Sequence, residues 1–147
     1  MFVSIIEINV FKVKFFLTDS LVNPEFWYRK LKSEHAGGLV VFEGRVRKNN
    51  QGKKVVQINY QSHPTLALQE GERIVTESSS HFNVIDALAV HRIGSLKLGE
   101  IAIWVGVISI HRREAFDACN HIVDSIKKKV PIWKKEQYED GSRKWLI

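Results

Sequence analysis

The chain has 147 residues, 44% of them hydrophobic and 26% charged, which is typical of one soluble globular domain. Its formal net charge of +6 predicts an anionic partner, such as a phosphate-bearing small molecule, an acidic protein or nucleic acid. The single cysteine, Cys119, excludes an intramolecular disulfide, and no Cys/His set has structural-zinc spacing. We therefore expect one domain over residues 1–147, a reducing compartment and no metal site.

Residues 2–17 are rich in Val, Ile and Phe and predict one or two strands, although residues 1–10 also fit an extension. Charged residues interrupt this stretch, so we expect neither a signal peptide nor a membrane span, and the cytoplasm is the predicted compartment. The sequence Asn-Pro-Glu at 23–25 then marks the start of a short helix that ends by Gly37. The residues expected on its buried side are Phe26, Trp27 and Leu31.

The middle of the chain alternates between strand and helix patterns. Residues 39–47 and 55–61 alternate apolar and polar side chains and predict an antiparallel hairpin, with Gly44 at a bulge. Pro64 opens a helix to about His81, and a strand over 84–90 follows. Residues 101–110 are apolar at nearly every position, which predicts a central strand covered on both faces. Core-facing positions of the 64–81 helix are Ala67, Gly71, Ile74, Val75 and Ser78.

The stretch 111–136 predicts an amphipathic helix followed by a stiff basic tail. Pro131 cannot continue a helix, so the helix should end at Val130. Lysines crowd around this point, and crowding with partial burial favours the neutral amine, which can act as a nucleophile or general base. A solvated helix end is the plainer alternative, because cations stabilise a helix C-terminus. The expected apolar face is Ala115, Phe116, Cys119, Ile122, Val123, Ile126 and Val130, and the lysines are Lys127, Lys128, Lys129, Lys134 and Lys135.

Hairpin-type strand pairs with helices between them predict an α+β fold with a mostly antiparallel sheet and packed helices. A turn and a final short strand are expected over 140–145.

Several segments together resemble one family, the large, catalytic subunit of molybdopterin synthase, called MoaE. These segments occur in the family's order and at family-like separations, and the resemblance spans roughly residues 15–145. They are VVFEGRVR (40–47), VHRIGSLKLGE (90–100), VGVISIHRREAFDAC (105–119), IKKKVPIWKKE (126–136) and DGSRKW (140–145).

The resemblance implies an α/β-hammerhead fold and a homodimer of large subunits. Each large subunit would bind one small ubiquitin-like sulfur-carrier subunit of the MoaD type, giving a heterotetramer. The small subunit's C-terminal thiocarboxylate would donate two sulfurs to cyclic pyranopterin monophosphate and so form the dithiolene of molybdopterin. No metal or dissociable cofactor is implied for this step, and no nucleic acid or membrane partner.

The resemblance also assigns site residues. Lys127 and Lys134 match the family's two active-site lysines, and the His111-Arg112 pair matches a pair near the dimer interface that helps form the pterin-phosphate site. The remaining matches are Phe42, Arg47 and Glu136, as substrate-binding residues. His91-Arg92 is assigned to structure.

These residue types suit the implied chemistry, because arginine binds anions with a fixed charge and lysine can transfer protons or stabilise developing anions. The alternative is a non-catalytic basic module. It would bind a ubiquitin-like partner or stack nucleic-acid bases on Trp133 and Trp145, which stand among lysines.

Overall fold

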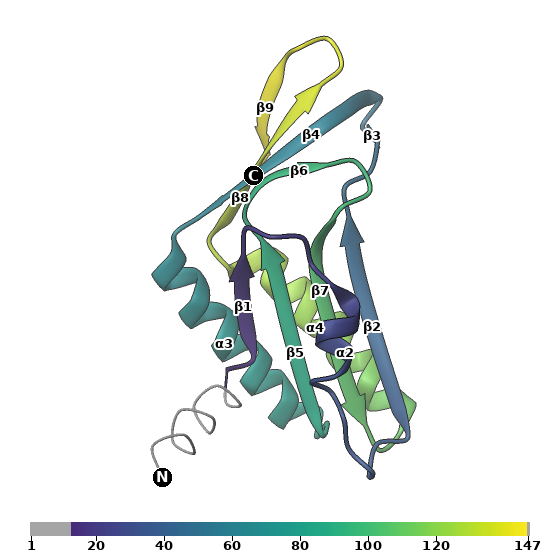
Figure 1. Ribbon diagram of the computed structural model, residues 1–147. Helices are drawn as coiled ribbons and strands as arrows, with labels where there is room; N and C mark the ends of the chain where they lie inside the picture. Colours follow the sequence, from purple (N-terminus) through teal and green to yellow (C-terminus); the bar gives the residue numbers. More distant parts are fainter. Residues whose placement is uncertain (1–12, 147) are drawn as a thin grey trace.

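The computed structural model describes residues 13–146, which form two β-sheets and three helices (Figure 1). Among these residues every strand pair is antiparallel except β1 with β5, so the predicted α+β class with mostly antiparallel pairing is confirmed. In chain order the elements are β1 Phe15–Thr18, α2 Pro24–Tyr28, β2 Gly38–Arg45, β3 Asn49–Asn50, β4 Lys53–Ser62, α3 Pro64–His81, β5 Asp86–Arg92, β6 Gly94–Lys97, β7 Ile101–Ser109, α4 Arg112–Lys129, β8 Ile132–Tyr138 and β9 Arg143–Leu146.

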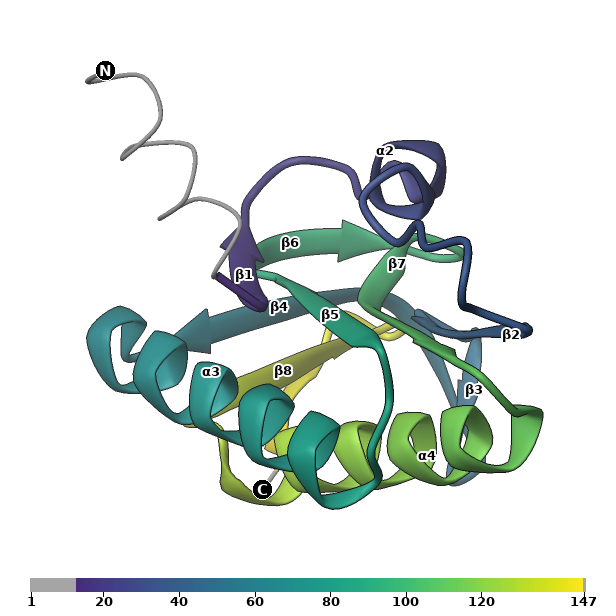
Figure 2. The ribbon, with the colours of Figure 1, turned by 90° about the horizontal axis from the view of Figure 1, so that it is seen from below.

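The first sheet has the strand order β1-β5-β7-β2, and it is covered on both faces. Helices α3 and α4 lie on one face and α2 on the other (Figure 2). Successive side chains of β7 point to opposite faces of this sheet. Val105 and Val107 join the core beneath α3 and α4, whereas Trp104 and Ile108 join the core beneath α2. The prediction of a central strand covered on both faces is therefore confirmed.

The two long helices confirm their predicted bounds. All five predicted core-facing residues of α3 are buried, and α4 lies between the N-cap His111 and the C-cap Val130. Phe116 was predicted to face the core, but 60% of its surface is exposed, so this prediction is wrong. The buried stripe of α4 passes through Ala115, Cys119, Ile122 and Ile126, and Phe116 lies about 100° from Ala115 around the helix. No helix among residues 13–146 is long and apolar enough to cross a bilayer.

The second sheet has the order β3-β4-β8-β9, with β6 also paired to β4. The predicted hairpin between the strands at 39–47 and 55–61 is wrong, because β2 pairs with β7 whereas β4 pairs with β8. The tight turn at Gln51-Gly52, where both φ angles are positive, instead joins β4 to the two-residue strand β3. The predicted bulge at Gly44 is confirmed by a register shift, and a Cβ there would lie 2.6 Å from Ile103 Cγ2.

Three further expectations need correction. The basic tail after Pro131 is strand β8, in which Glu136 and Tyr138 are buried and Ile132 packs against the core beneath α3 and α4. Helix α2 begins as predicted at the Asn23 cap but ends at Tyr28, and Phe26 is half exposed. The expected order of elements also lacked strand β6, which lies between β5 and β7 and pairs with β4. Of the strands predicted over 2–17, β1 is present, and residues 1–12 lie outside the described part.

Gly71 of α3 leads to the first prediction. A Cβ at this position would collide with the ring of Phe15, which is 1% exposed. Gly71→Ala should therefore lower the free energy of unfolding by about 1–3 kcal/mol, although alanine favours helix. Urea denaturation should measure the loss. Thr76→Ala, at an exposed position of the same helix, is the control and should change stability by less than about 0.5 kcal/mol; equal effects would contradict the close packing.

Candidate active site

A cavity of about 570 Å³ lies where the two sheets meet the C-terminal end of α4. Its walls come from β2, β3, β4, β5, β7, β8 and β9, together with the last turn of α4. Five of the seven predicted site residues line it, namely Phe42, Arg47, Lys127, Lys134 and Glu136. These five residues come from segments up to 94 residues apart in the sequence, from Phe42 to Glu136.

The end of α4 selects one lysine from three. Lys127 lines the cavity, and its Nζ lies 5.6 Å from the centre of the Phe42 ring, within the range of a cation–π contact. Lys128 does not line it, and Lys129 lines a separate groove between α3 and α4. Successive helical residues are 100° apart, so one of three adjacent lysines can face the first sheet at this point.

Lys134 reaches the same cavity from β8. Side chains alternate along a strand, so Lys134 and Glu136 share the cavity face while Trp133, which is 48% exposed, faces away. Lys134 pairs with Tyr60 of β4 in the register of the second sheet. The seven-residue separation from Lys127 therefore spans a helix end, a turn and the start of a strand.

Glu136 is a buried carboxylate, 2% exposed. Its Oε1 accepts a hydrogen bond of 2.8 Å from Asn50 Nδ2, whereas Oε2 is buried and has no hydrogen-bond partner among the described residues. Burial, and secondarily the charge of Glu136, raises the pKa of Tyr60 to about 12, so this phenol keeps its proton. Asn50 and Tyr60 were not predicted as site residues. Tyr60 is placed by the pairing of β4 with the distant strands β6 and β8, and the tight turn from β3 to β4 places Asn50 beside them. No local pattern in the sequence shows the pairing of β4 with these distant strands.

His91 also lines the cavity, although sequence reasoning assigned it to structure. The side chain is 8% exposed, its Nδ1 lies 2.7 Å from the carbonyl oxygen of Arg92, and its ring stands 5.0 Å from the ring of Tyr60. Burial lowers the pKa of His91 to about 4; the Lys127 charge adds to this, while the Arg92 carbonyl opposes it. The imidazole is therefore neutral at neutral pH. One feature of the sequence could have indicated a site role for His91, namely that it is a titratable residue at the end of a buried strand.

Among the described residues, three of the cations that line the cavity are not ion-paired, whereas a fourth, Arg45, pairs with Glu43. Arg47, Lys127 and Lys134 form no ion pair within 4.0 Å among residues 13–146. Arg47 and Lys127 are exposed, whereas Glu136 and His91 are buried. Free cations thus stand at the solvent side of the cavity, ready to pair with anions, and the hydrogen-bond acceptors lie deeper.

His111 and Arg112 are not brought to this cavity. They stand at the N-terminus of α4, and 15 to 16 residues separate them from Lys127, which is about 22–24 Å of helix. Exposed apolar side chains stand close to the pair in the sequence: Ile110 is 56% exposed and Phe116, one helical turn after Arg112, is 60% exposed.

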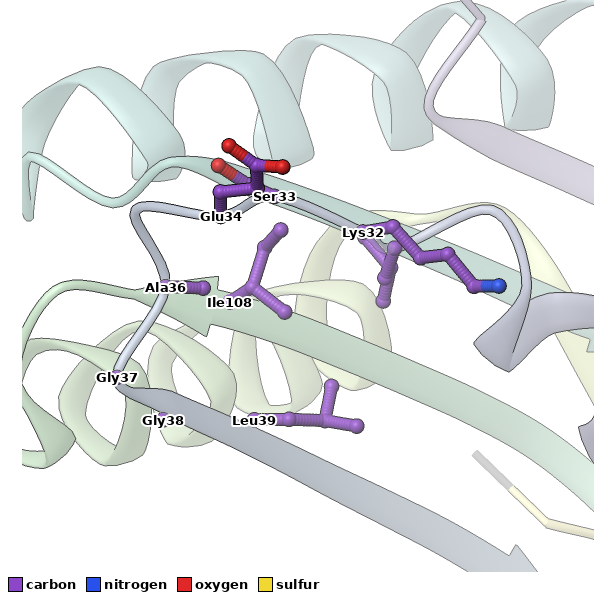
Figure 3. A pocket seen from close by; sticks show the side chains of 9 residues that line it. Lys32, Ser33, Glu34, Ala36, Gly37, Gly38, Leu39 and Ile108 are labelled. Atoms are coloured by element: carbon purple, nitrogen blue, oxygen red, sulfur yellow. The ribbon is translucent and has the colours of Figure 1, made fainter.

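Two other features lie outside the cavity. Cys119 is 3% exposed in the core, as predicted, and burial raises the pKa of its thiol to about 11. A second hollow, of about 660 Å³, lies between the loop before β2 and the end of β7. Figure 3 shows Leu39 and Ile108 lining it, with the charged ends of Lys32 and Glu34 projecting in different directions. No predicted site residue lines this hollow, and no group of three or more His, Cys, Asp or Glu residues within 13–146 could hold a metal ion.

His91 gives a prediction for pH dependence. Its pKa is lower in the folded chain than the usual 6.5, so the unfolded chain binds more protons and stability falls as pH drops from about 6.5 to 4. Between pH 7 and pH 4.5 this residue should account for about 2 kcal/mol of lost unfolding free energy. Urea denaturation at both values should show a smaller loss for His91→Phe than for the wild type.

The control is His121→Phe, at an exposed histidine of α4, which should keep the wild-type loss. In the wild type, the NMR signals of the His91 ring should titrate near pH 4. A midpoint near 6.5 would contradict the buried neutral imidazole.

The chain matches a family model and curated relatives. The model, described as "MoaE protein", matches residues 17–129. The chain is 47% identical over 111 residues to the molybdopterin synthase catalytic subunit of Pyrococcus abyssi, which covers 76% of this chain and 75% of that relative.

Solved structures have the same fold. Molybdopterin synthase from Staphylococcus aureus superposes with a TM-score of 0.84 at 31% identity, covering 92% of this chain and 97% of that one. A chain from the Helicobacter pylori complex of subunits 1 and 2 of molybdopterin-converting factor superposes with a TM-score of 0.72 at 15% identity, covering 88% and 87%. The second likeness concerns the fold alone.

Proposed function

Because this chain belongs to the MoaE family, we propose that it is the catalytic subunit of a molybdopterin synthase, a transferase of molybdenum-cofactor biosynthesis. In finer terms it is a sulfurtransferase. It moves two sulfurs from the thiocarboxylated C-terminus of a small ubiquitin-like subunit to cyclic pyranopterin monophosphate. The proposed reaction uses no resident metal or dissociable cofactor.

The observation that carries this proposal is the single cavity at the end of α4. It combines free cations with a buried carboxylate and an aromatic ring, and all five of these lining residues were assigned to substrate or catalysis from sequence. Both reactants are anionic, since the pterin carries a phosphate and the partner's tail a thiocarboxylate. A cavity in which Arg47, Lys127 and Lys134 have no ion-pair partner among the described residues suits both.

Each transfer forms a C–S bond on the pterin side chain. The thiocarboxylate's own C–S bond is then cleaved by water, which leaves the partner's tail as a carboxylate. The oxygen displaced from the pterin carbon needs a proton, and negative charge develops at the acyl oxygen during hydrolysis. Lys127 acts mainly beside the thiocarboxylate carbon, Lys134 stabilises an anion or donates a proton, and Arg47 binds an anionic group.

The partner is proposed to be a small subunit of the MoaD type, whose tail enters the cavity. The positive net charge of +6 supports an acidic partner. The Helicobacter pylori relative, which has this fold, was solved in a protein–protein complex of subunits 1 and 2.

Lys127→Ala tests the catalytic assignment. The variant should lose at least about a hundredfold in sulfur transfer, because a charged group at the reacting centre is removed. The assay mixes the chain with thiocarboxylated small subunit and cyclic pyranopterin monophosphate and quantifies the dithiolene-bearing pterin.

Lys128→Ala is the matched control, since it removes the same charge one residue away and outside the cavity. It should keep activity within about threefold of the wild type. Both variants should bind the small subunit as the wild type does. Full turnover by Lys127→Ala would overturn the assignment, and a stable complex without turnover in the wild type would indicate a non-catalytic scaffold.

A homodimer would complete the site. His111 and Arg112 lie about 22–24 Å of helix away from Lys127 of their own chain, so they can serve a cavity of this kind only in another copy. The exposed side chains of Ile110 and Phe116 near the pair support a contact surface there. The two large subunits of this homodimer, each with one small subunit bound, form the proposed heterotetramer.

Mixed dimers test this arrangement. Lys127→Ala and Arg112→Ala chains, each with its own affinity tag, should both be inactive as pure dimers. A mixed dimer purified through both tags should regain about half of wild-type sulfur transfer, because one of its two sites is intact. A mixed dimer as inactive as its parents, or a monomeric wild type by sedimentation, would contradict the shared site.

A further inference from the structure

His91 is a cavity residue for which the proposed reaction has no role yet. It stands at the end of β5, where the first sheet meets the second, and its ring packs edge-on against Tyr60 of β4 at an interplanar angle of 76°. Its side chain is 8% exposed and lines the same cavity as Lys127 and Glu136. A buried imidazole on the wall of a ligand-sized cavity is a candidate for contact with the ligand.

The hydrogen bond of His91 to the backbone fixes its tautomer. A carbonyl oxygen can only accept, so the 2.7 Å contact with the Arg92 carbonyl requires a proton on Nδ1. In the neutral ring, Nε2 then carries a free lone pair. Burial lowers the pKa of His91 to about 4, which keeps the ring neutral under ordinary conditions. Nε2 has no hydrogen-bond partner among residues 13–146.

The cavity therefore has two kinds of polar wall. Arg47, Lys127 and Lys134 offer only donors, which suits phosphate and thiocarboxylate oxygens. Nε2 of His91 and Oε2 of Glu136 offer acceptors, which would repel those anions. An acceptor wall instead suits a ligand edge that carries N–H groups, and the pterin ring system has several.

We propose that His91 is a substrate-binding residue whose Nε2 accepts a hydrogen bond from an N–H group of the pterin heterocycle. This inference rests on the proposed function, because it takes the pterin as the ligand of the cavity. It places the heterocycle towards His91 and Glu136 and the anionic groups towards the cations. His91 thus selects the ligand by its ring edge and takes no proton from it.

Two substitutions separate a hydrogen-bond role from a packing role. His91→Phe keeps a ring against Tyr60 but removes the acceptor, whereas the side-chain oxygen of His91→Gln can reach the position of Nε2. The assembled complex with its small subunit is titrated calorimetrically with cyclic pyranopterin monophosphate, and steady-state sulfur transfer gives kcat and KM.

We expect His91→Phe to raise Kd and KM about tenfold while kcat stays within about threefold, and His91→Gln to restore Kd to within about threefold of the wild type. Competition by inorganic phosphate, which has no N–H edge, should be unchanged in both variants. His121→Phe, outside the cavity, is the control and should match the wild type.

Wild-type Kd in His91→Phe would overturn the proposal. So would an equal fall of kcat in both variants at unchanged Kd, which is the signature of proton transfer. Failure of the proposed function is distinguishable, since the wild type itself would then neither bind the pterin nor transfer sulfur, and that result would overturn both.

Discussion

The turn from α4 into β8 is the constraint on which the site depends. Pro131 has no N–H to continue the helix, and Val130 adopts an extended conformation (φ −75°, ψ 130°). The backbone is fixed on both sides of this turn, because Ile132 N–H donates to the Val130 carbonyl and His63 N–H donates to the Pro131 carbonyl. The last helical turn and the new strand therefore face one hollow, and a lysine from each reaches it.

Burial differs across this hollow and decides which of its groups are held neutral. Arg47 and Lys127 stand exposed at the solvent side, without an ion-pair partner among the described residues. Tyr60 and His91 lie deeper and stay neutral because burial disfavours their charged forms. Glu136 keeps one oxygen on Asn50 and leaves the other unsatisfied, which costs free energy that a bound donor would recover. Such a site is incomplete without its ligand.

Local signals in the sequence predicted the helices and the central strand. Pro64 and Pro131 punctuate the chain, and the apolar period of α3 and the uniform apolarity of β7 report burial directly. Strand pairing was harder, because the partner of β2 is β7, some sixty residues away, whereas the sequence favoured the adjacent strand β4. The same limit applies to the site. Spacing and family resemblance predicted the lysines and Glu136, but Tyr60 and His91 reach the cavity through long-range sheet pairings that no short motif encodes. Asn50 is carried there with β4, to which a tight turn joins its strand.

Helix α4 carries proposed site residues at both ends, Lys127 at one and the His111-Arg112 pair at the other. Its 18 residues span about 27 Å, so Lys127 and the His111-Arg112 pair of one chain are too far apart to hold one small substrate. Under two-fold symmetry, each helix would give its C-terminal lysine to its own cavity and its N-terminal pair to the partner's. Positive charge would then reach each cavity from two chains. Within one chain, Lys127 and the His111-Arg112 pair would stay a helix length apart. The exposed Phe116 fits this arrangement, because its ring gives the surface beside Arg112 an apolar side chain that a second copy could contact. A ring buried in the core could not make that contact.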